Sequence, residues 1–296
     1  MSNFITKKFY EQRVDFQQIS AAHDEMLTFP KGVIEYQDVP YSDDNLKEHR
    51  MDIFRPEGRE DEILPVIIDV HGGGLLLGSK EFNRFFCAEI SAMGFLVFSI
   101  EYRLVPECLS YDQYADCSMA MDAIQQLIPQ YKGDPEHVYV VGDSGGAYLI
   151  VYTIAMQKCQ KLAEAAHVTP STLDVKALGL ISGMFYTTRL DKIGMFLPKY
   201  LYGKKYKKSS FAPYTNPEHP DIVTALPPCY LITSHEDHLQ HYTLNFEKAL
   251  TRHHVPHELL NFAENPKLKH AFLVFDPYMD ESVEAMTSML DFLRKY

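Results

Sequence analysis

The amino-acid sequence predicts an α/β fold built on a mostly parallel, eight-stranded sheet that is flanked by helices. Apolar runs with the length of buried strands recur eight times along the chain, and helix-like segments separate the later ones. Alternation of strand and helix implies parallel strands that are covered on both faces. A chain of 296 residues is long enough for one such domain with a sizeable core, so we expect a single domain over residues 1–296.

The expected elements follow in chain order. The stretch up to about residue 29 carries scattered apolar residues among charges and is expected to be helical. The strand-like runs are residues 33–39, 50–54, 66–70, 95–100, 138–141, 177–181, 230–233 and 258–262. The turn-rich stretch 41–45 links the first two runs, which is consistent with an antiparallel hairpin. Helix-like segments cover residues 82–93, 112–128, 147–163 and 279–296.

The pattern breaks between residues 184 and 220. This stretch is rich in Phe, Leu, Tyr and Lys, and it is too long for a simple loop in a compact domain. We therefore expect residues 184–220 to form structure of their own rather than a simple loop between two strands.

A serine between glycines lies at the junction of a predicted strand and a predicted helix. Residues 142–146 read Gly-Asp-Ser-Gly-Gly, directly after the apolar run 138–141. This arrangement is typical of a nucleophile elbow, in which a turn too tight for side chains exposes the serine hydroxyl on a strained backbone. Ser144 is therefore the candidate nucleophile, and a plain glycine-rich turn is the alternative.

Three successive glycines follow another strand-like run. Residues 71–74 read His-Gly-Gly-Gly and come directly after the run 65–70. Such glycines let backbone N–H groups turn toward a bound oxygen without a side-chain clash. An acyl hydrolase needs these donors because negative charge builds on the carbonyl oxygen in the transition state. A phosphate-binding loop is disfavoured, since no Lys-Ser or Lys-Thr follows the glycines; a flexible loop is the alternative.

An acid and a histidine complete the pattern. Glu236 and Asp237 follow the strand-like run 229–234, and His270 lies in a loop after the last run, residues 257–262. The chain order of serine, acid and histidine is that of the serine-elbow hydrolases rather than of the chymotrypsin or subtilisin types. Because Glu236 and Asp237 are adjacent, chain position alone does not separate them.

With these segments the chain resembles the α/β-hydrolase superfamily, in its hormone-sensitive-lipase-like branch of esterases. The resemblance spans roughly residues 45–296, and five segments carry it: residues 71–74, 102–107 (Tyr-Arg-Leu-Val-Pro-Glu), 134–136, 142–146 and 226–239. It implies Ser144 as nucleophile, Asp237 as orienting acid and His270 as base. It also implies an oxyanion hole that is formed by the backbone N–H groups of Gly72, Gly73 and Gly145.

The resemblance further implies a helical cap over the active site. Residues of about 1–30 and about 185–220 are expected to form it. The candidate substrate-binding residues are Leu75, Phe185 and Tyr186, although ordinary packing explains the two aromatic residues equally well. The chain departs from the family pattern at His238 and Ala271, where the family usually has Pro after the acid and Gly after the histidine.

Composition narrows the partners and the compartment. A net charge of −12 argues against nucleic acid, because phosphate binding needs a basic surface. Five cysteines without paired spacing, and a first segment without a signal-like apolar core, favour reduced thiols in the cytoplasm. No run approaches the ~18 apolar residues that a membrane span requires. His235, His238 and His241 stand three apart, but the His-Glu-x-x-His zinc motif is absent, so no metal is expected.

The expected function is the cofactor-free hydrolysis of short-chain carboxylic esters, with a small-molecule ester as the partner. An amidase, for example a formamidase, that uses the same triad is an alternative. A non-catalytic ligand-binding protein on the same fold is another, and the presence of all three triad candidates argues against it. The natural ester and the oligomeric state, a homodimer included, stay open at this stage.

Overall fold

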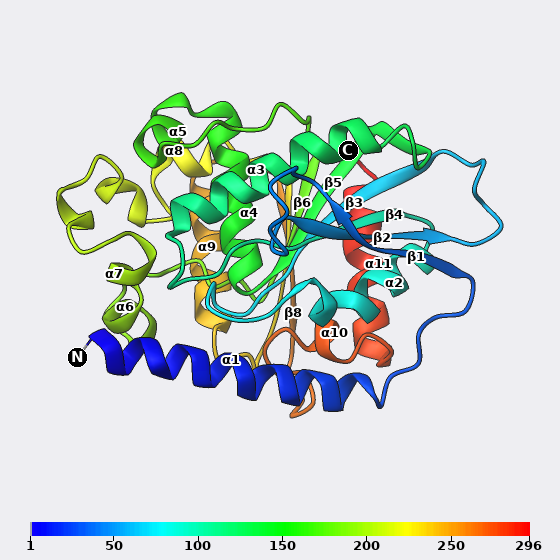
Figure 1. The fold of residues 1–296 in the computed structure, drawn as a ribbon, viewed down its shortest axis with the longest axis horizontal. Coiled ribbons are helices and arrows are strands. Elements are labelled where there is room, and N and C mark those ends of the chain that lie inside the picture. Colours follow the sequence, from blue (N-terminus) through cyan, green and yellow to red (C-terminus); the bar gives the residue numbers. More distant parts are fainter. Residues whose placement is uncertain (1) are drawn as a thin grey trace.

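The computed structural model describes residues 2–296 and contains the predicted sheet of eight strands (Figure 1). The strands are β1 (Val33–Pro40), β2 (Arg50–Pro56), β3 (Leu64–Val70), β4 (Leu96–Ile100), β5 (Gly133–Asp143), β6 (Ala177–Ile181), β7 (Cys229–Ser234) and β8 (His257–Phe262). Their order across the sheet is β1-β2-β4-β3-β5-β6-β7-β8. Strand β2 runs antiparallel to both neighbours, and the remaining pairs are parallel. The predicted fold class and the hairpin of the first two strands are confirmed.

Helices cover both faces of the sheet because the central strands are apolar on both sides. In β3, Val66 and Ile68 belong to one core cluster and Ile67 belongs to the other, as the alternation of a strand requires. The first cluster includes buried residues of α3 (Ser110–Leu127), α4 (Gly145–Lys158) and α9 (Gln240–Arg252). The second includes those of α2 (Arg84–Ala92), α10 (Phe272–Phe275) and α11 (Asp280–Leu293).

One predicted helix is divided in two. The segment 147–163 was expected to be continuous, but α4 ends at Lys158 and α5 (Gln160–Ala166) follows. Cys159 between them has an extended backbone, with φ at −123°. The segment contains neither Gly nor Pro, so the local sequence carries no signal for this break.

Two segments far apart in the sequence lie side by side. Helix α1 (Ser2–Asp24) runs along the lower edge of the molecule in Figure 1, below α6 (Lys192–Phe196) and α7 (Pro198–Leu201). The rings of Phe9 in α1 and Tyr200 in α7 are 5.1 Å apart and meet edge to face. The stretch 185–220 also contains 3₁₀ turns at Tyr206–Lys208 and Ala212–Thr215, and α8 (Pro220–Val223) begins at its end.

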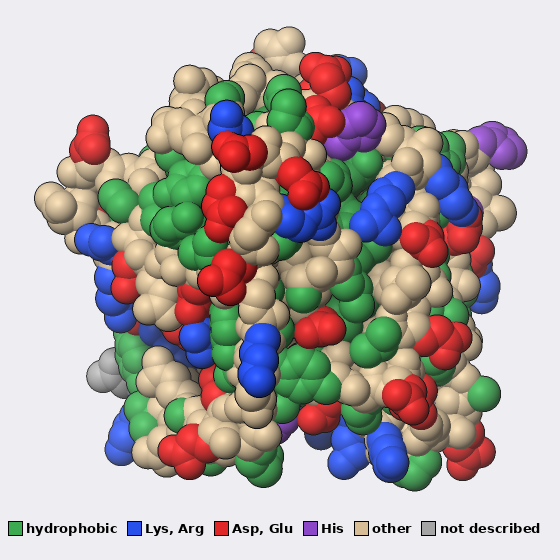
Figure 2. All heavy atoms as spheres, turned by 90° about the vertical axis from the view of Figure 1, so that its right-hand side faces the viewer, with side chains coloured by type: hydrophobic (Ala, Val, Ile, Leu, Met, Phe, Trp, Pro, Cys, Tyr) green, Lys and Arg blue, Asp and Glu red, His purple; other side chains and the backbone are tan. Residues whose placement is uncertain are grey.

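Charges of both signs lie on the face of the molecule that contains the right-hand side of Figure 1. On the face shown in Figure 2, acidic and basic side chains are interspersed with apolar ones. Within residues 2–296, no helix combines the length and apolar character that crossing a membrane would need. The five cysteines of this part of the chain form no disulfide, and only Cys159 is not buried.

Candidate active site

Ser144 occupies a strained corner between β5 and α4. Its φ of 48° and ψ of −110° lie where residues with side chains are rarely found, which is the backbone expected of a nucleophile elbow. Its N–H group donates to the Ile181 carbonyl at 2.8 Å, and this contact fixes the corner against β6. The glycine at position 146 is required because a Cβ there would lie 1.8 Å from the carbonyl oxygen of Val70 in β3.

Gly146→Ala is expected to destabilise the fold by more than about 3 kcal/mol, because backbone rather than a flexible side chain blocks the added methyl group. Urea denaturation followed by circular dichroism measures this change. Gly58→Ala is the matched control, since Gly58 has a positive φ of 76° but no atom within 4 Å of an added Cβ. Strain alone should then cost about 1–2 kcal/mol. Equal losses for the two variants would contradict the role assigned to close approach.

The structure brings Ser144, His270 and Asp237 together in one hydrogen-bonded series. Nε2 of His270 lies 2.9 Å from Oγ of Ser144, and Nδ1 lies 2.7 Å from Oδ1 of Asp237. The three residues follow the carboxyl ends of β5, β8 and β7, which meet at one edge of the sheet. Glu236 points elsewhere: its carboxylate is 2.9 Å from Nδ1 of His235 and is exposed. Geometry therefore separates the two adjacent acids.

Asp237 is held by more than His270. Its Oδ1 accepts the N–H of Leu239 at 2.8 Å, and its Oδ2 accepts the hydroxyl of Thr233 at 3.0 Å. Burial disfavours the charge on Asp237, but the hydrogen bond and charge of His270, together with the Leu239 N–H and a hydrogen bond from Ser182, outweigh it. The pKa of Asp237 is therefore lowered, so the carboxylate is ionised at neutral pH.

Ser182 is a site residue that sequence reasoning missed. Its Oγ accepts the N–H of Ala271, which directly follows His270, at 3.0 Å. Ser182 thus links the histidine loop to the end of β6. The only signal in the sequence was its position directly after a predicted strand that ends at the edge where Ser144 lies.

The oxyanion-hole prediction needs one correction. The N–H group of Gly72 donates to Oδ1 of Asp143 at 2.8 Å, so it is directed away from a substrate oxygen and the assignment of Gly72 is wrong. Gly73 and Gly74 line the cavity next to Ser144 instead. A Cβ on Gly145 would lie 3.1 Å from the Gly74 nitrogen, so Gly145 stands directly beside this loop. We expect the donors to be Gly73, Gly74 and Gly145.

A buried network holds the start of the glycine loop. Asp143 accepts hydrogen bonds from Gly72 and from the side-chain amide of Asn83, the latter at 3.1 Å. The ring of His71 stacks on Tyr102 with centroids 4.3 Å apart, and its Nε2 lies 2.8 Å from Glu101. The Tyr102 hydroxyl also donates to the His71 carbonyl at 2.7 Å, so the segment that begins at Tyr102 holds the start of the glycine triplet in place.

An apolar cavity of about 330 Å³ opens beside Ser144. Its walls include Phe16 from α1, Ile193 from α6 and Leu197, and further side chains come from Leu76, Leu77, Phe82, Met184, His238, Leu239 and Phe275. None of the three predicted substrate-binding residues is among the lining residues of this cavity.

Each of those three side chains has another partner. Leu75 has a φ of 70° and a fully buried side chain in the main core cluster. Phe185 stacks on Phe246 with centroids 4.3 Å apart. The hydroxyl of Tyr186 donates to Glu218 at 2.7 Å. The substrate-binding assignments of Leu75, Phe185 and Tyr186 are therefore wrong, because core packing occupies these residues.

His238 lies close to the triad. Its ring centroid is 4.4 Å from that of His270, and burial together with the charge of His270 lowers its pKa. Asp237, His238 and His270 are near enough to offer three metal-ligand atoms. Asp237 and His270 are, however, already paired with each other, and the free edge of His270 faces Ser144. His235 and His241 do not join this group.

Comparison with known proteins identifies the family. A family model described as alpha/beta hydrolase fold matches residues 67–274. The chain belongs to this family. The superfamily that the motifs predicted is thereby confirmed.

Several solved structures show the same architecture over nearly all of this chain. Esterase B from Lactobacillus rhamnosis (HN001) is 22% identical and superposes with a TM-score of 0.92, covering 100% of this chain and 96% of that chain. A form of esterase B inhibited by a tributyrin phosphonate gives a TM-score of 0.93. A bacterial heroin esterase is 23% identical with a TM-score of 0.73, covering 98% of this chain and 92% of that one. At these identities the likeness establishes the fold.

Curated relatives of this alpha/beta hydrolase match it over shorter segments. A probable isoprenylcysteine alpha-carbonyl methylesterase of Oryza sativa subsp. japonica is 32% identical over 135 residues, which are 46% of this chain and 32% of the relative. Esterase LipQ of Mycobacterium tuberculosis is 29% identical over 114 residues, or 38% of this chain and 27% of the relative. The chain spans at most half the length of the first three curated relatives.

Proposed function

We propose that the protein is a carboxylic ester hydrolase that works through an acyl-enzyme on Ser144. The observation that carries this proposal is the hydrogen-bonded line from Asp237 through His270 to Ser144, which ends at an apolar cavity. The esterases among the solved neighbours and curated relatives support the same reaction class.

The geometry suits proton transfer through His270. Nε2 accepts the proton of Ser144 as Oγ attacks the ester carbonyl, because a neutral serine hydroxyl is a poor nucleophile. Nδ1–H donates to Asp237, which keeps the imidazole in the right tautomer and stabilises the imidazolium that forms. The N–H groups of Gly73, Gly74 and Gly145 would hold the tetrahedral oxyanion. The alcohol leaves with the proton from His270, and water then repeats the sequence on the acyl-enzyme.

Two segments would form the cap of a single domain. Helix α1 supplies Phe16 to the cavity wall, and the stretch 185–220 supplies Ile193 and Leu197. Both segments therefore shape the space that the acyl group of the substrate would occupy, which is the role we propose for a cap formed by about residues 1–30 and 185–220.

The nucleophile can be tested directly with a fluorophosphonate probe. An active hydrolase should be labelled at Ser144, and peptide mass spectrometry locates the adduct. Absence of labelling in folded protein would instead favour a ligand-binding protein on this fold. A parallel assay with p-nitrophenyl esters and the matching anilides separates an esterase from an amidase.

The cavity predicts a preference for short, uncharged acyl chains. Its lining is almost wholly apolar, and its volume is about 330 Å³. We expect p-nitrophenyl butyrate to be cleaved at least about tenfold faster than the palmitate, since forcing excess methylene groups into a filled site costs about 1–3 kcal/mol. The measurement is kcat/KM over esters of rising chain length. A maximum at the long-chain esters would contradict this preference.

We also propose a small-molecule ester as the partner and the cytoplasm as the location. The cysteines support the location, since all five are present as free thiols and four of them are buried.

A further inference from the structure

The loop that carries the glycine triplet is conformationally costly. Gly73, Gly74 and Leu75 have φ values of 104°, 62° and 70°, so three successive residues lie in the left-handed region. Leu75 carries a side chain there, and such a conformation persists only where the surrounding structure over-determines it. The contacts that hold Leu75 and Leu76 therefore decide where the N–H groups of Gly73 and Gly74 point.

Three carbonyl groups show how the loop is held. The Leu75 carbonyl accepts the Val105 N–H at 3.0 Å and the side-chain amide of Gln113 at 3.1 Å. The next carbonyl, that of Leu76, accepts Nε–H of Arg13, and the Val105 carbonyl accepts an Nη2–H of the same guanidinium at 2.6 Å. Arg13 thus donates to one carbonyl on each of the two chain segments that meet at Leu75 and Val105.

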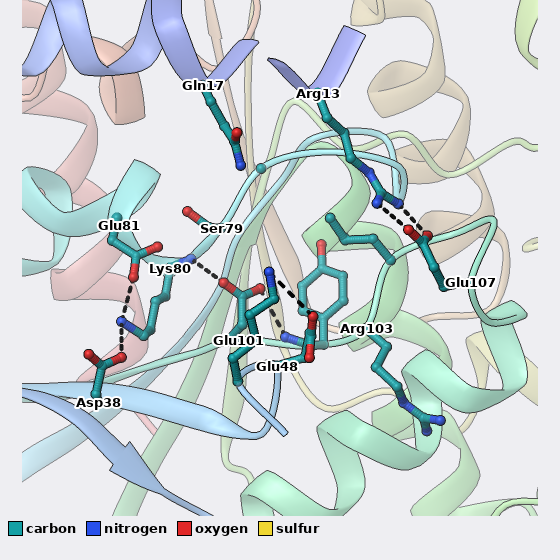
Figure 3. Close-up of a pocket in the computed structure, with 14 residues that line it drawn as sticks. Arg13, Gln17, Asp38, Glu48, Ser79, Lys80, Glu81, Glu101, Arg103 and Glu107 are labelled. Atoms are coloured by element: carbon teal, nitrogen blue, oxygen red, sulfur yellow. Dashed lines mark hydrogen bonds and ion pairs between the residues drawn. The ribbon is translucent and has the colours of Figure 1, made fainter. Parts of the chain in front are cut away.

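Arg13 reaches this loop from α1. On its other side it forms a two-point ion pair with Glu107, at 2.6 and 2.7 Å, as Figure 3 shows. Its side chain is only 17% exposed. A guanidinium suits this position because its planar donors make four hydrogen bonds here, to two carbonyls and to both oxygens of one carboxylate, whereas a lysine ammonium has three N–H groups on a single atom.

We propose that Arg13 is a positioning residue for the oxyanion hole. It fixes the Leu76 and Val105 carbonyls and thereby holds Gly73 and Gly74 in the conformation that directs their N–H groups toward the reacting carbonyl. Phe16, three residues further along α1, lines the acyl cavity, so one face of this helix both shapes the cavity and sets the oxyanion loop. The proposal rests on the proposed ester hydrolysis at Ser144.

Two variants separate positioning from simple anchoring of the helix. Arg13→Lys keeps a cation for Glu107 but loses the planar fork, so we expect kcat for p-nitrophenyl butyrate to fall about 10- to 100-fold while KM stays within about threefold. Glu107→Gln removes the ion pair but leaves both carbonyl contacts, so kcat should stay within about threefold while Tm falls. Lys8→Gln removes an exposed pair with Glu11 on the same helix and should change neither quantity.

A transition-state analogue supplies a readout that helix anchoring would not move. Ser144 Oγ would add to the carbonyl carbon of an alkyl trifluoromethyl ketone. The resulting adduct carries its oxyanion where the oxyanion hole would bind it. Its inhibition constant should rise in Arg13→Lys by the same factor by which kcat/KM falls, whereas binding of the corresponding alcohol should not change. In Arg13→Ala, millimolar guanidinium should restore part of kcat, and it should not accelerate the wild type.

The outcomes distinguish failure of the positioning role of Arg13 from failure of the proposed ester hydrolysis at Ser144. Loss of kcat in Glu107→Gln with no loss in Arg13→Lys would show that Arg13 only anchors α1, and this result would overturn the positioning role. Wild-type kcat and wild-type affinity for the ketone in Arg13→Lys would overturn it as well. If the wild type neither cleaves esters nor reacts with a fluorophosphonate, ester hydrolysis itself fails. If Arg13→Ala does not fold, Arg13→Lys and Glu107→Gln decide the question.

Discussion

Ser144→Ala is expected to lower the turnover of a short p-nitrophenyl ester by about 10⁴-fold or more, as loss of the nucleophile does in other serine triads. The reason is local: Oγ of Ser144 is the atom that Nε2 of His270 contacts at 2.9 Å beside the cavity. Residual turnover would come from the oxyanion hole and binding alone.

The same substitution should leave the fold intact. The contacts that fix the elbow use the backbone of residue 144, which donates to Ile181 and accepts from Met184, and alanine keeps both. Far-ultraviolet circular dichroism and Tm report the fold, while a stopped assay with purified variant reports turnover. Ser209→Ala, at an exposed serine, is the matched control. Turnover within tenfold of wild type, in a preparation free of contaminating esterase, would remove Ser144 from the mechanism.

Asp237→Asn should produce the second largest loss, roughly 10²- to 10⁴-fold in kcat. An amide at position 237 can donate toward Nδ1 of His270, which favours the tautomer that cannot accept the serine proton at Nε2. The residue is only 4% exposed and accepts the Leu239 N–H through the oxygen that also faces His270. The amide that donates to His270 therefore also loses the Leu239 contact, while the volume of the side chain hardly changes.

Glu236→Gln is the matched control for the adjacent acid. The Glu236 carboxylate is exposed and lies beside His235, so its removal should leave kcat within about tenfold of wild type. Steady-state kinetics of both variants on one ester gives the ranking. A larger loss in Glu236→Gln than in Asp237→Asn would transfer the role of the acid to Glu236.

The pKa of Asp237 also bears on the pH dependence of the reaction. Because the contacts of its carboxylate outweigh burial and hold this pKa below the usual range, Asp237 loses its charge only at acidic pH. An ionisation that governs kcat/KM near neutral pH would therefore not belong to Asp237.

Local pattern was sufficient for the sheet and for the order of the catalytic residues. Buried strands are short, apolar and bounded by turns, so each of the eight produces its own signal whatever surrounds it. A serine between glycines after such a strand likewise indicates an elbow, since the turn is too tight for a side chain at Gly142 or Gly146. The break at Cys159 produced no local signal, because the segment 147–163 contains no helix-breaking Gly or Pro.

The choice among similar neighbours needed the tertiary structure. Gly72, Gly73 and Gly74 look alike in sequence, and only the approach of Asp143 from β5 shows that the N–H of Gly72 is already engaged. Glu236 and Asp237 are adjacent, and only the direction of each side chain shows which one meets His270.

The sequence by itself determined the fold class, the family and the three residues of the triad as candidates, because each strand, motif and candidate residue is recognised within a short stretch of the chain. The tertiary structure alone decided what surrounds the reacting serine. Leu75, Phe185 and Tyr186 turn into the core, while Phe16 and Arg13 reach the site from a helix more than 120 residues before Ser144. Side-chain direction follows from backbone conformation and from which surfaces pack together, and neither is encoded within a short window of sequence.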